Sequence, residues 1–154
     1  MMIRIYAAVF ALCCSIACTA QTPTDLSVPD EVSRRFMLED LWPRFDISER
    51  INPFYLRADL DGDGKPDYVV LVSEKSTHQE YTVLLLSSEA KVRLYPSKGR
   101  TFDGWTIVDQ RYLTQHMRAV LRATHREAFV TKFGGPGILE YWDGKELKSE
   151  PWGD

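Results

Sequence analysis

The chain has 154 residues, of which 44% are hydrophobic and 27% charged, and its formal net charge is -3. This length and balance are typical of one folded domain and exclude a largely disordered or multi-spanning protein. The basic residues are interspersed with acidic ones, so the composition also excludes a clustered Lys/Arg face of the kind that binds nucleic acid.

The N-terminal segment, residues 1–20, differs in composition from the rest of the chain. Arg4 is its only charge, and an apolar stretch from Ile5 to Ile16 precedes the small residues Ala17 to Ala20. A basic start, a short apolar stretch and small residues at the exit are typical of a secretory signal peptide. The apolar stretch is too short for a membrane span, which needs about 20 residues. We therefore predict export to the periplasm or out of the cell, with cleavage after Ala20.

The cysteines qualify this prediction, because Cys13, Cys14 and Cys18 all lie inside the predicted signal. A chain cut after Ala20 has no cysteine, so bracing in an oxidising compartment must come from something other than a disulfide, such as a metal ion. The segment Ser15-Ile-Ala-Cys18 also resembles a bacterial lipoprotein processing site, although Ser15 stands where leucine is usual. Lipid attachment at Cys18 is thus the alternative to soluble release, and it is the only membrane contact that the sequence predicts.

The mature chain begins with a flexible leader, predicted over residues 21–29 from its Pro, Thr and Ser content. We predict a single folded domain over residues 30–154. Its first element is a helix over residues 31–42, with Asp30 as the cap and Pro43 as the end, because apolar residues recur at helical spacing. The residues expected outside its apolar face are Glu31, Arg34, Arg35, Glu39 and Asp40.

The rest of the domain reads mainly as strands. Segments rich in β-branched residues or alternating in polarity predict strands over residues 54–58, 67–72, 80–86, 90–95, 101–108, 128–133, 138–142 and 145–148. The last two form a hairpin across Asp143-Gly144, a strong turn signal. Residues 45–53 predict a connection, and residues 109–124 fit either a helix, which we prefer, or a strand. The pattern as a whole predicts an α+β fold with a mainly antiparallel sheet and one or two helices.

One segment carries the pattern of a metal-binding loop, Asp59-Leu-Asp-Gly-Asp-Gly-Lys-Pro-Asp67. Asp59, Asp61 and Asp63 alternate, and Asp67 stands at position nine. A tightly wound backbone can aim these carboxylates inward, and the carbonyl of Lys65 adds another oxygen. Such ligands favour Ca2+ over Mg2+, which demands stricter geometry, and over Zn2+, which usually takes His or Cys. The alternative is a solvated turn in which the aspartates only cap backbone amides.

The residues after the loop indicate that this site is structural. Position twelve, where an EF-hand has a bidentate Glu, is Val70, so a calcium sensor that opens on binding is not expected. The segment from Asp59 to Val70 resembles the calcium loop and following strand of FG-GAP and VCBS repeats. The chain has one copy, so no propeller is implied. Its layout is similar to small exported bacterial FG-GAP-like proteins, a resemblance that implies a calcium loop in an envelope protein and no reaction.

No residue pattern in the sequence indicates a catalytic site. His78, His116 and His125 lack the spacing of a metal-binding motif, and Gly134 to Gly137 lacks the lysine and the strand and helix of a phosphate loop. We interpret the histidines as ordinary surface or core residues and the glycine segment as a tight turn. Enzyme activity is therefore unsupported by the sequence.

Three aromatic residues near the C-terminus, Tyr141, Trp142 and Trp152, form either a stacking surface for a glycan or partner protein or, as we prefer, part of the core. The leading hypothesis is an exported envelope domain that binds an envelope protein or glycan and whose calcium loop rigidifies the start of a central strand. The alternatives are an inhibitor or immunity-type protein against a hydrolase or toxin, and an unrecognised envelope hydrolase.

Overall fold

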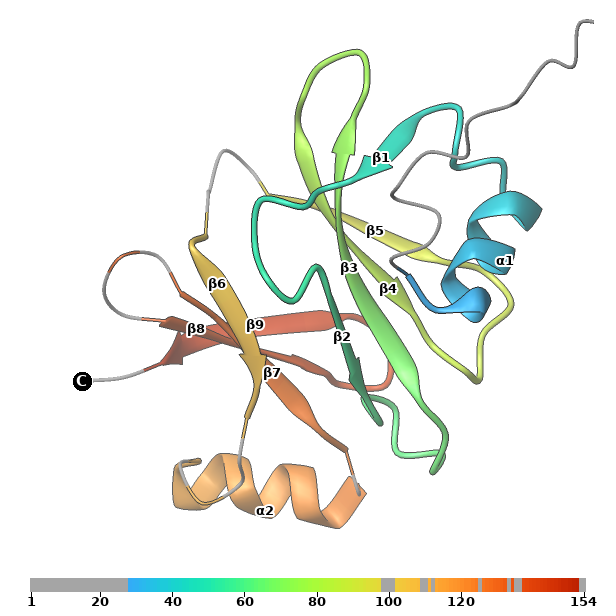
Figure 1. The fold of residues 1–154 in the computed structure, drawn as a ribbon. Coiled ribbons are helices and arrows are strands. Elements are labelled where there is room, and N and C mark those ends of the chain that lie inside the picture. The colour runs from blue at the N-terminus through green and yellow to red at the C-terminus, as the bar shows by residue number, and fades with distance from the viewer. Residues whose placement is uncertain are drawn as a thin grey trace, which may run out of the picture.

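The computed structural model describes residues 28–97, 102–108, 111, 113–124, 126–132, 134 and 137–152. The predicted signal peptide with Cys18 and most of the predicted leader lie outside the described residues. In the described part, two antiparallel sheets and two helices form the fold (Figure 1). The predicted α+β class with a mainly antiparallel arrangement is confirmed.

The first sheet is five-stranded and the second four-stranded. The first sheet contains β1 (Phe45–Ile47), β2 (Tyr55–Ala58), β3 (Asp67–Glu74), β4 (Glu80–Leu85) and β5 (Arg93–Pro96). Strands β3, β4 and β5 follow one another, and β2 and β1 pair with successive halves of the other side of β3. The second sheet contains β6 (Gly104–Ile107), β7 (Ala128–Lys132), β8 (Gly137–Trp142) and β9 (Leu147–Trp152), in that order.

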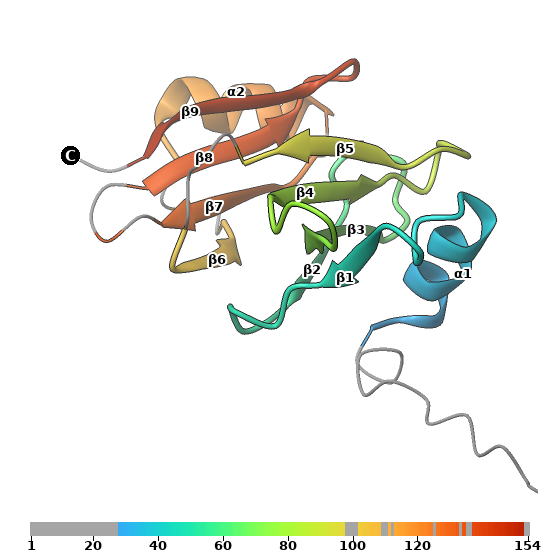
Figure 2. The same cartoon turned by 90° about the horizontal axis from the view of Figure 1, so that it is seen from above.

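The two sheets and helices α1 (Asp30–Leu38) and α2 (Gln115–Thr124) are stacked in four layers, with the sheets in the middle (Figure 2). The alternation of side chains along β3 explains this order, since Val69 and Leu71 pack between the sheets whereas Val70 and Val72 pack towards α1. Strand β7 does the same in the second sheet, where Phe129 packs between the sheets and its neighbours pack towards α2. Every central strand is therefore covered on both faces.

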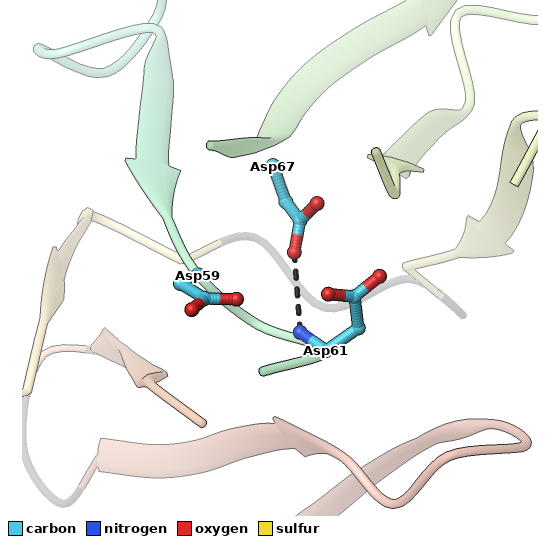
Figure 3. A group of neighbouring side chains, drawn as sticks. All are labelled: Asp59, Asp61 and Asp67. Atoms are coloured by element: carbon cyan, nitrogen blue, oxygen red, sulfur yellow. Dashed lines mark hydrogen bonds between the residues drawn. The ribbon is translucent and has the colours of Figure 1, made fainter. Parts of the chain in front are cut away.

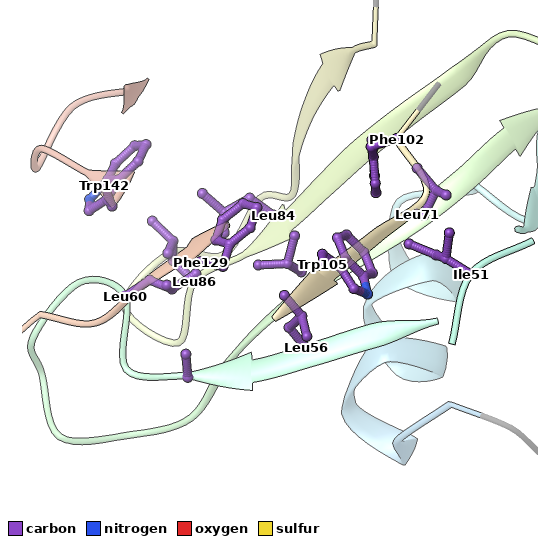
Figure 4. Close-up of a cluster of buried hydrophobic side chains, with 12 residues drawn as sticks. Ile51, Leu56, Leu60, Leu71, Leu84, Leu86, Phe102, Trp105, Phe129 and Trp142 are labelled. Carbon is purple, nitrogen blue, oxygen red and sulfur yellow. The ribbon is translucent and has the colours of Figure 1, made fainter. Parts of the chain in front are cut away.

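The interior between the sheets holds two tryptophans and two phenylalanines (Figure 4). Trp105, Phe129 and Trp142 come from the second sheet and meet leucines of the first, among them Leu71 and Leu84. This cluster continues to Leu60, which lies in the Asp-rich loop and is 0% exposed. The loop is thus anchored in the core that joins the two sheets.

The structure corrects three predictions about α1. The helix ends at Leu38 rather than at Trp42, because Asp40 takes a left-handed conformation with φ 53°. The amide of Leu41 then donates to the carbonyl of Phe36 at 2.9 Å, which is the closing bond of a Schellman motif. Pro29 rather than Asp30 occupies the N-cap position, and Arg35, expected outside the apolar face, is only 6% exposed.

The strands are mostly where the sequence predicts them, with one omission. The connection predicted over residues 45–53 contains β1, whose three residues are too few to give a clear alternation. The helical alternative for residues 109–124 is confirmed by α2, and the hairpin turns at Asp143-Gly144 with Gly144 at φ 102°. Neither described helix has the length and apolar character that a membrane crossing requires.

Candidate metal centre

The Asp-rich loop, residues 59–67, connects the end of β2 to the start of β3. One carboxylate oxygen from each of Asp59, Asp61 and Asp67 lies within 4.8 Å of the other two (Figure 3). Calcium takes oxygen ligands at about 2.3–2.6 Å, so two ligands on opposite sides of the ion are about 5 Å apart. The three oxygens therefore fit around one Ca2+, although their spacing does not by itself single out calcium.

Hydrogen bonds within the loop hold these carboxylates in place. Asp59 accepts from the amide of Gly62 through Oδ1, at 2.8 Å, and from that of Gly64 through Oδ2, at 2.9 Å. Asp61 accepts from the amide of Asp63 and from the hydroxyl of Ser88. Such bonds are those of a capped turn, and they also leave lone pairs on the same oxygens for a cation. The loop is thus preorganised for an ion without depending on one.

Asp67 is the most enclosed member of the group, with 0% exposure. Its carboxylate accepts from the amide of Leu60 at 2.8 Å, of Asp61 at 3.2 Å and of Ser87 at 2.6 Å. Burial raises the pKa of Asp67 above its usual range, and these hydrogen bonds only partly oppose the rise. A cation beside Asp67 would stabilise the ionised form that burial disfavours.

Asp63, also predicted as a ligand, is placed differently, and the role of the Lys65 carbonyl as a ligand stays a prediction. Asp63 is not one of the three converging aspartates. Its Oδ1 accepts from the amide of Lys65 at 2.8 Å and its Oδ2 from the hydroxyl of Ser87 at 2.7 Å. The Ser87 hydrogen bond is the main cause that lowers the pKa of Asp63. The predicted ligand set is therefore brought together at Asp59, Asp61 and Asp67, with Asp63 beside it.

Four residues that the sequence did not relate to the loop complete its surroundings. Ser87 and Ser88, which follow β4, bind the loop from the first sheet. Arg126 and Glu127, which precede β7, bind it from the second sheet. No spacing in the sequence relates these residues to the loop, because their proximity depends on how the two sheets pack.

The two loop glycines, Gly62 and Gly64, both have left-handed backbones, with φ 82° and 81°. Their surroundings differ sharply. A Cβ at Gly62 would lie 2.2 Å from the carbonyl oxygen of Thr124, at the end of α2, whereas a Cβ at Gly64 would meet nothing within 4 Å. Gly62 is therefore required by the contact between the two halves of the fold as well as by the turn.

The predicted aromatic surface is divided between different environments. Trp142 is 3% exposed and packs between the sheets, with the Arg93 guanidinium 4.6 Å from its ring centre. Tyr141 and Trp152 are half-buried against the cluster under α2, and the Tyr141 hydroxyl donates to Glu150 at 2.8 Å. Burial and this bond raise the pKa of Tyr141. The three side chains do not share one exposed face.

The other residues considered for chemistry are only partly described. His78 is exposed in the turn between β3 and β4, with φ 58°. The side chain of His116 and the whole of His125 lie outside the described residues. Gly134 has φ 61° and Gly137 begins β8, but the two residues between them are also outside the described part.

Comparisons with known proteins add no assignment to this geometry. A scan against protein-family models, a search of curated proteins and a search of solved structures each found no match. The site must therefore be interpreted from its own residues.

Proposed function

We propose that this chain is an exported envelope domain in which Ca2+ braces the junction of the two sheets. The ion would be held by Asp59, Asp61 and Asp67, with Asp63 and the carbonyl of Lys65 as further oxygens. The observation that carries the proposal is the position of the loop, because the same few residues that present the carboxylates are bonded to both sheets.

The bond to the second sheet is made through the backbone of Asp59. The amide of Asp59 donates to Oε2 of Glu127 at 2.7 Å, and the amide of Glu127 donates back to the carbonyl of Asp59 at 2.7 Å. Arg126 extends this contact, since its Nε donates to the carbonyl of Asp61 at 3.2 Å and its Nη1 to that of Trp142 at 3.1 Å. Tightening the loop therefore tightens the contact between β2, β7 and β8.

The charge of the loop explains why a cation would stabilise the fold. Residues 59–67 contain four carboxylates and one basic side chain, that of Lys65. The Nζ of Lys65 is 3.9 Å from Asp63 and its side chain is 71% exposed, so it offsets little of the repulsion. A divalent ion among Asp59, Asp61 and Asp67 would offset it directly.

Thermal unfolding of the purified protein tests the brace. The protein is stripped with EDTA and then melted with Ca2+, with Mg2+ or with neither. Calcium at about 100 times its dissociation constant adds about 2.7 kcal/mol, which for a domain of this size raises Tm by about 10 °C. We expect a smaller rise with Mg2+. A melting temperature that does not respond to Ca2+ or EDTA would overturn the proposal.

A matched pair of aspartate variants assigns the effect to the loop. Asp61→Asn keeps the shape of the side chain and removes its charge, and we expect it to lose most of the calcium-dependent rise. Asp46→Asn is the control, because Asp46 lies on β1 with its side chain 66% exposed and pairs only with Lys75 at 3.3 Å among the described ion pairs. An Asp61→Asn protein with the full calcium response would contradict the assignment of the ligand.

A braced domain with two covered sheets suits a role in presenting a binding surface, and we propose an envelope protein or a glycan as its partner. The test is capture from an envelope extract by the purified protein, with and without Ca2+. We expect one component to be captured by the wild type and by Asp46→Asn, and less of it by Asp61→Asn. If the wild type captures nothing in either condition, the binding role is contradicted. The calcium brace is tested separately, by the thermal unfolding experiment.

A further inference from the structure

A pocket of about 250 Å3 lies beside the Asp-rich loop, between α1 and the start of β3. Its wall from α1 includes Arg35 and Glu31, and its wall from the loop includes Lys65. Apolar groups, among them those of Tyr68 and Leu85, complete the lining. Two of the three charged side chains in the lining are therefore basic, although the chain as a whole is acidic.

Arg35 is the unusual residue of this pocket. Its side chain is 8% exposed, and both Nε and Nη2 are buried with no hydrogen-bond acceptor among the described residues. The nearest carboxylate oxygen in an ion pair with it, Oε1 of Glu31, is 4.0 Å from Nη1, on the other edge of the guanidinium. Buried charges in proteins are normally paired and hydrogen-bonded, so the Nε–Nη2 edge is chemically incomplete.

Three other arginines show what this edge does elsewhere in the same molecule. Arg50 uses Nε and Nη2 to bind both carboxylate oxygens of Glu80, at 2.9 and 2.8 Å. Arg93 binds Glu89 in the same way, with both distances 2.7 Å. Arg34 also holds both carboxylate oxygens of Glu31, with Nε 3.0 Å from Oε2 and Nη2 2.6 Å from Oε1. This bidentate geometry is the preferred one for a guanidinium and a planar carboxylate.

The two carboxylates that interact with the charge of Arg35 are already engaged. Glu31 is held by Arg34 on the exposed side of α1, and Glu89 is held by Arg93. Glu89 is close enough to Arg35 for the positive charge to contribute to the lowering of the pKa of Glu89, but the Arg93 bond is the larger cause. The acceptor for Arg35 must therefore come from outside these pairs.

We propose that this pocket is a binding site for a small organic carboxylate, whose two oxygens dock on the Nε–Nη2 edge of Arg35. Lys65 adds a second positive charge at the mouth, and the apolar lining accommodates a short hydrocarbon part of the ligand. Both donors are shielded from water in the structure, so the proposed docking requires that a long side chain of the lining change its rotamer. This site uses none of the aspartates of the proposed calcium brace, although it borders the loop and shares Lys65 with it.

Titration followed by NMR of the arginine Nε–H groups tests the site. The probes are acetate, butyrate and inorganic phosphate, added to the calcium-loaded and the EDTA-treated protein at constant ionic strength. We expect saturable shifts of the Arg35 signal with the carboxylates and severalfold tighter binding of butyrate than of acetate. The Arg50 and Arg93 signals serve as internal controls, because their edges are occupied, and they should not move.

Four variants distinguish bidentate hydrogen bonding by the Nε–Nη2 edge of Arg35 from attraction by its positive charge alone. Arg35→Met should abolish the shifts of the pocket signals, and Arg35→Lys should weaken binding about tenfold or more, because it keeps the charge and loses the bidentate hydrogen bonds. Glu31→Gln should strengthen binding, since it removes the negative charge from the lining. Arg44→Met is the control, with its side chain 60% exposed and paired with Glu74; it should bind as the wild type does.

Several outcomes would overturn the proposal. The first is the absence of saturable shifts at Arg35 with either carboxylate, and the second is binding that survives in Arg35→Lys at wild-type affinity. Binding of phosphate but of neither carboxylate would reject the proposed ligand class. If Arg35→Met does not fold, the wild type and Arg35→Lys still decide between these results.

Discussion

The Asp-rich loop and the Arg35 pocket are neighbours that share Lys65 and Pro66, and Ser87 of the pocket lining binds the loop. Their charged groups nevertheless differ in how far their hydrogen bonds are satisfied. In the loop, every carboxylate oxygen of the four aspartates accepts a hydrogen bond. In the pocket, two donors of one buried guanidinium have no acceptor among the described residues. The loop can therefore fold without its ion, whereas the pocket carries a cost that a ligand would remove.

This contrast separates two kinds of site. A preorganised cluster of carboxylates binds an ion because the ion offsets the repulsion among them. Such a cluster can be recognised in the sequence from its regularly spaced acidic residues. A buried unpaired charge binds a ligand that completes its hydrogen bonds, and no residue spacing in the sequence predicts such a site. The following predictions test each side of the contrast, beginning with the largest expected effect.

The contact of the loop with the second sheet is tested most strongly by Gly62→Ala. The added methyl group would be 2.2 Å from the Thr124 carbonyl oxygen and would also force alanine into a left-handed backbone. We expect a loss of about 4 kcal/mol in the free energy of unfolding. Gly64→Ala has the same backbone strain and open space around the methyl group, so we expect about 1 kcal/mol. Equal losses in urea unfolding would show that the contact at Gly62 contributes nothing.

The hydrogen-bond saturation of the loop is tested by Asp67→Ala in EDTA. This change leaves the buried amide of Leu60 and the part-buried amides of Asp61 and Ser87 without their acceptor, and we expect a loss of about 3 kcal/mol even without metal. Asp61→Ala removes a more exposed carboxylate and should cost about 1 kcal/mol under the same conditions. Unfolding free energies in EDTA that are the same for the two variants would contradict the ranking.

The cost of the unpaired guanidinium is tested by comparing Arg35→Met with Arg50→Met. Arg35→Met replaces a buried charge with an apolar chain of similar length, so without ligand we expect unchanged stability or a gain of about 1 kcal/mol. Arg50→Met removes the pair with Glu80 and the bond to the Phe102 carbonyl, and we expect a loss of about 1–2 kcal/mol. A larger loss for Arg35→Met than for Arg50→Met, measured by urea unfolding, would reverse this part of the comparison.

The smallest expected effect concerns Asp143, in the Asp-Gly turn between β8 and β9. This turn serves as a reference for an aspartate that only caps backbone amides. The amides of Glu146 and Lys145 donate to its Oδ1 at 2.8 Å each and lower the pKa of Asp143. Because the folded pKa lies below the unfolded one, the stabilisation is present above the unfolded pKa of about 3.9 and is lost as the pH falls through the folded value. The stability difference between wild type and Asp143→Ala should therefore be larger at pH 6 than at pH 3, in urea unfolding with EDTA. A difference that grows in acid would contradict the assignment.

The sequence predicts the parts of the fold that depend on local patterns. The β-branched run of β3, the Asp143-Gly144 hairpin and the loop itself are all specified within a few consecutive residues. The end of α1 was mispredicted because Asp40 adopts a left-handed Schellman turn before Pro43 is reached. Strand β1 was missed because three residues carry too little periodicity.

The surroundings of the sites could not be predicted for a different reason. Ser87 and Glu127 reach the loop only because the sheets pack face to face, and that packing is set by side chains far apart in the chain. Arg35 was expected on the polar side of α1 because arginine is usually exposed. Its position three residues after Val32 and one before Phe36 places it on the buried face instead.

The paired bonds between Asp59 and Glu127 also constrain the order in which the molecule can be completed. The two residues are 68 positions apart, so the loop is synthesised well before its partner. Closing such a long segment costs chain entropy before the contact forms, and folding steps of this kind are slow. A nascent chain that stops before Arg126 therefore has the Asp-rich loop but not its bonds to the second sheet, and the two sheets can pack together only after β7 to β9 have been synthesised.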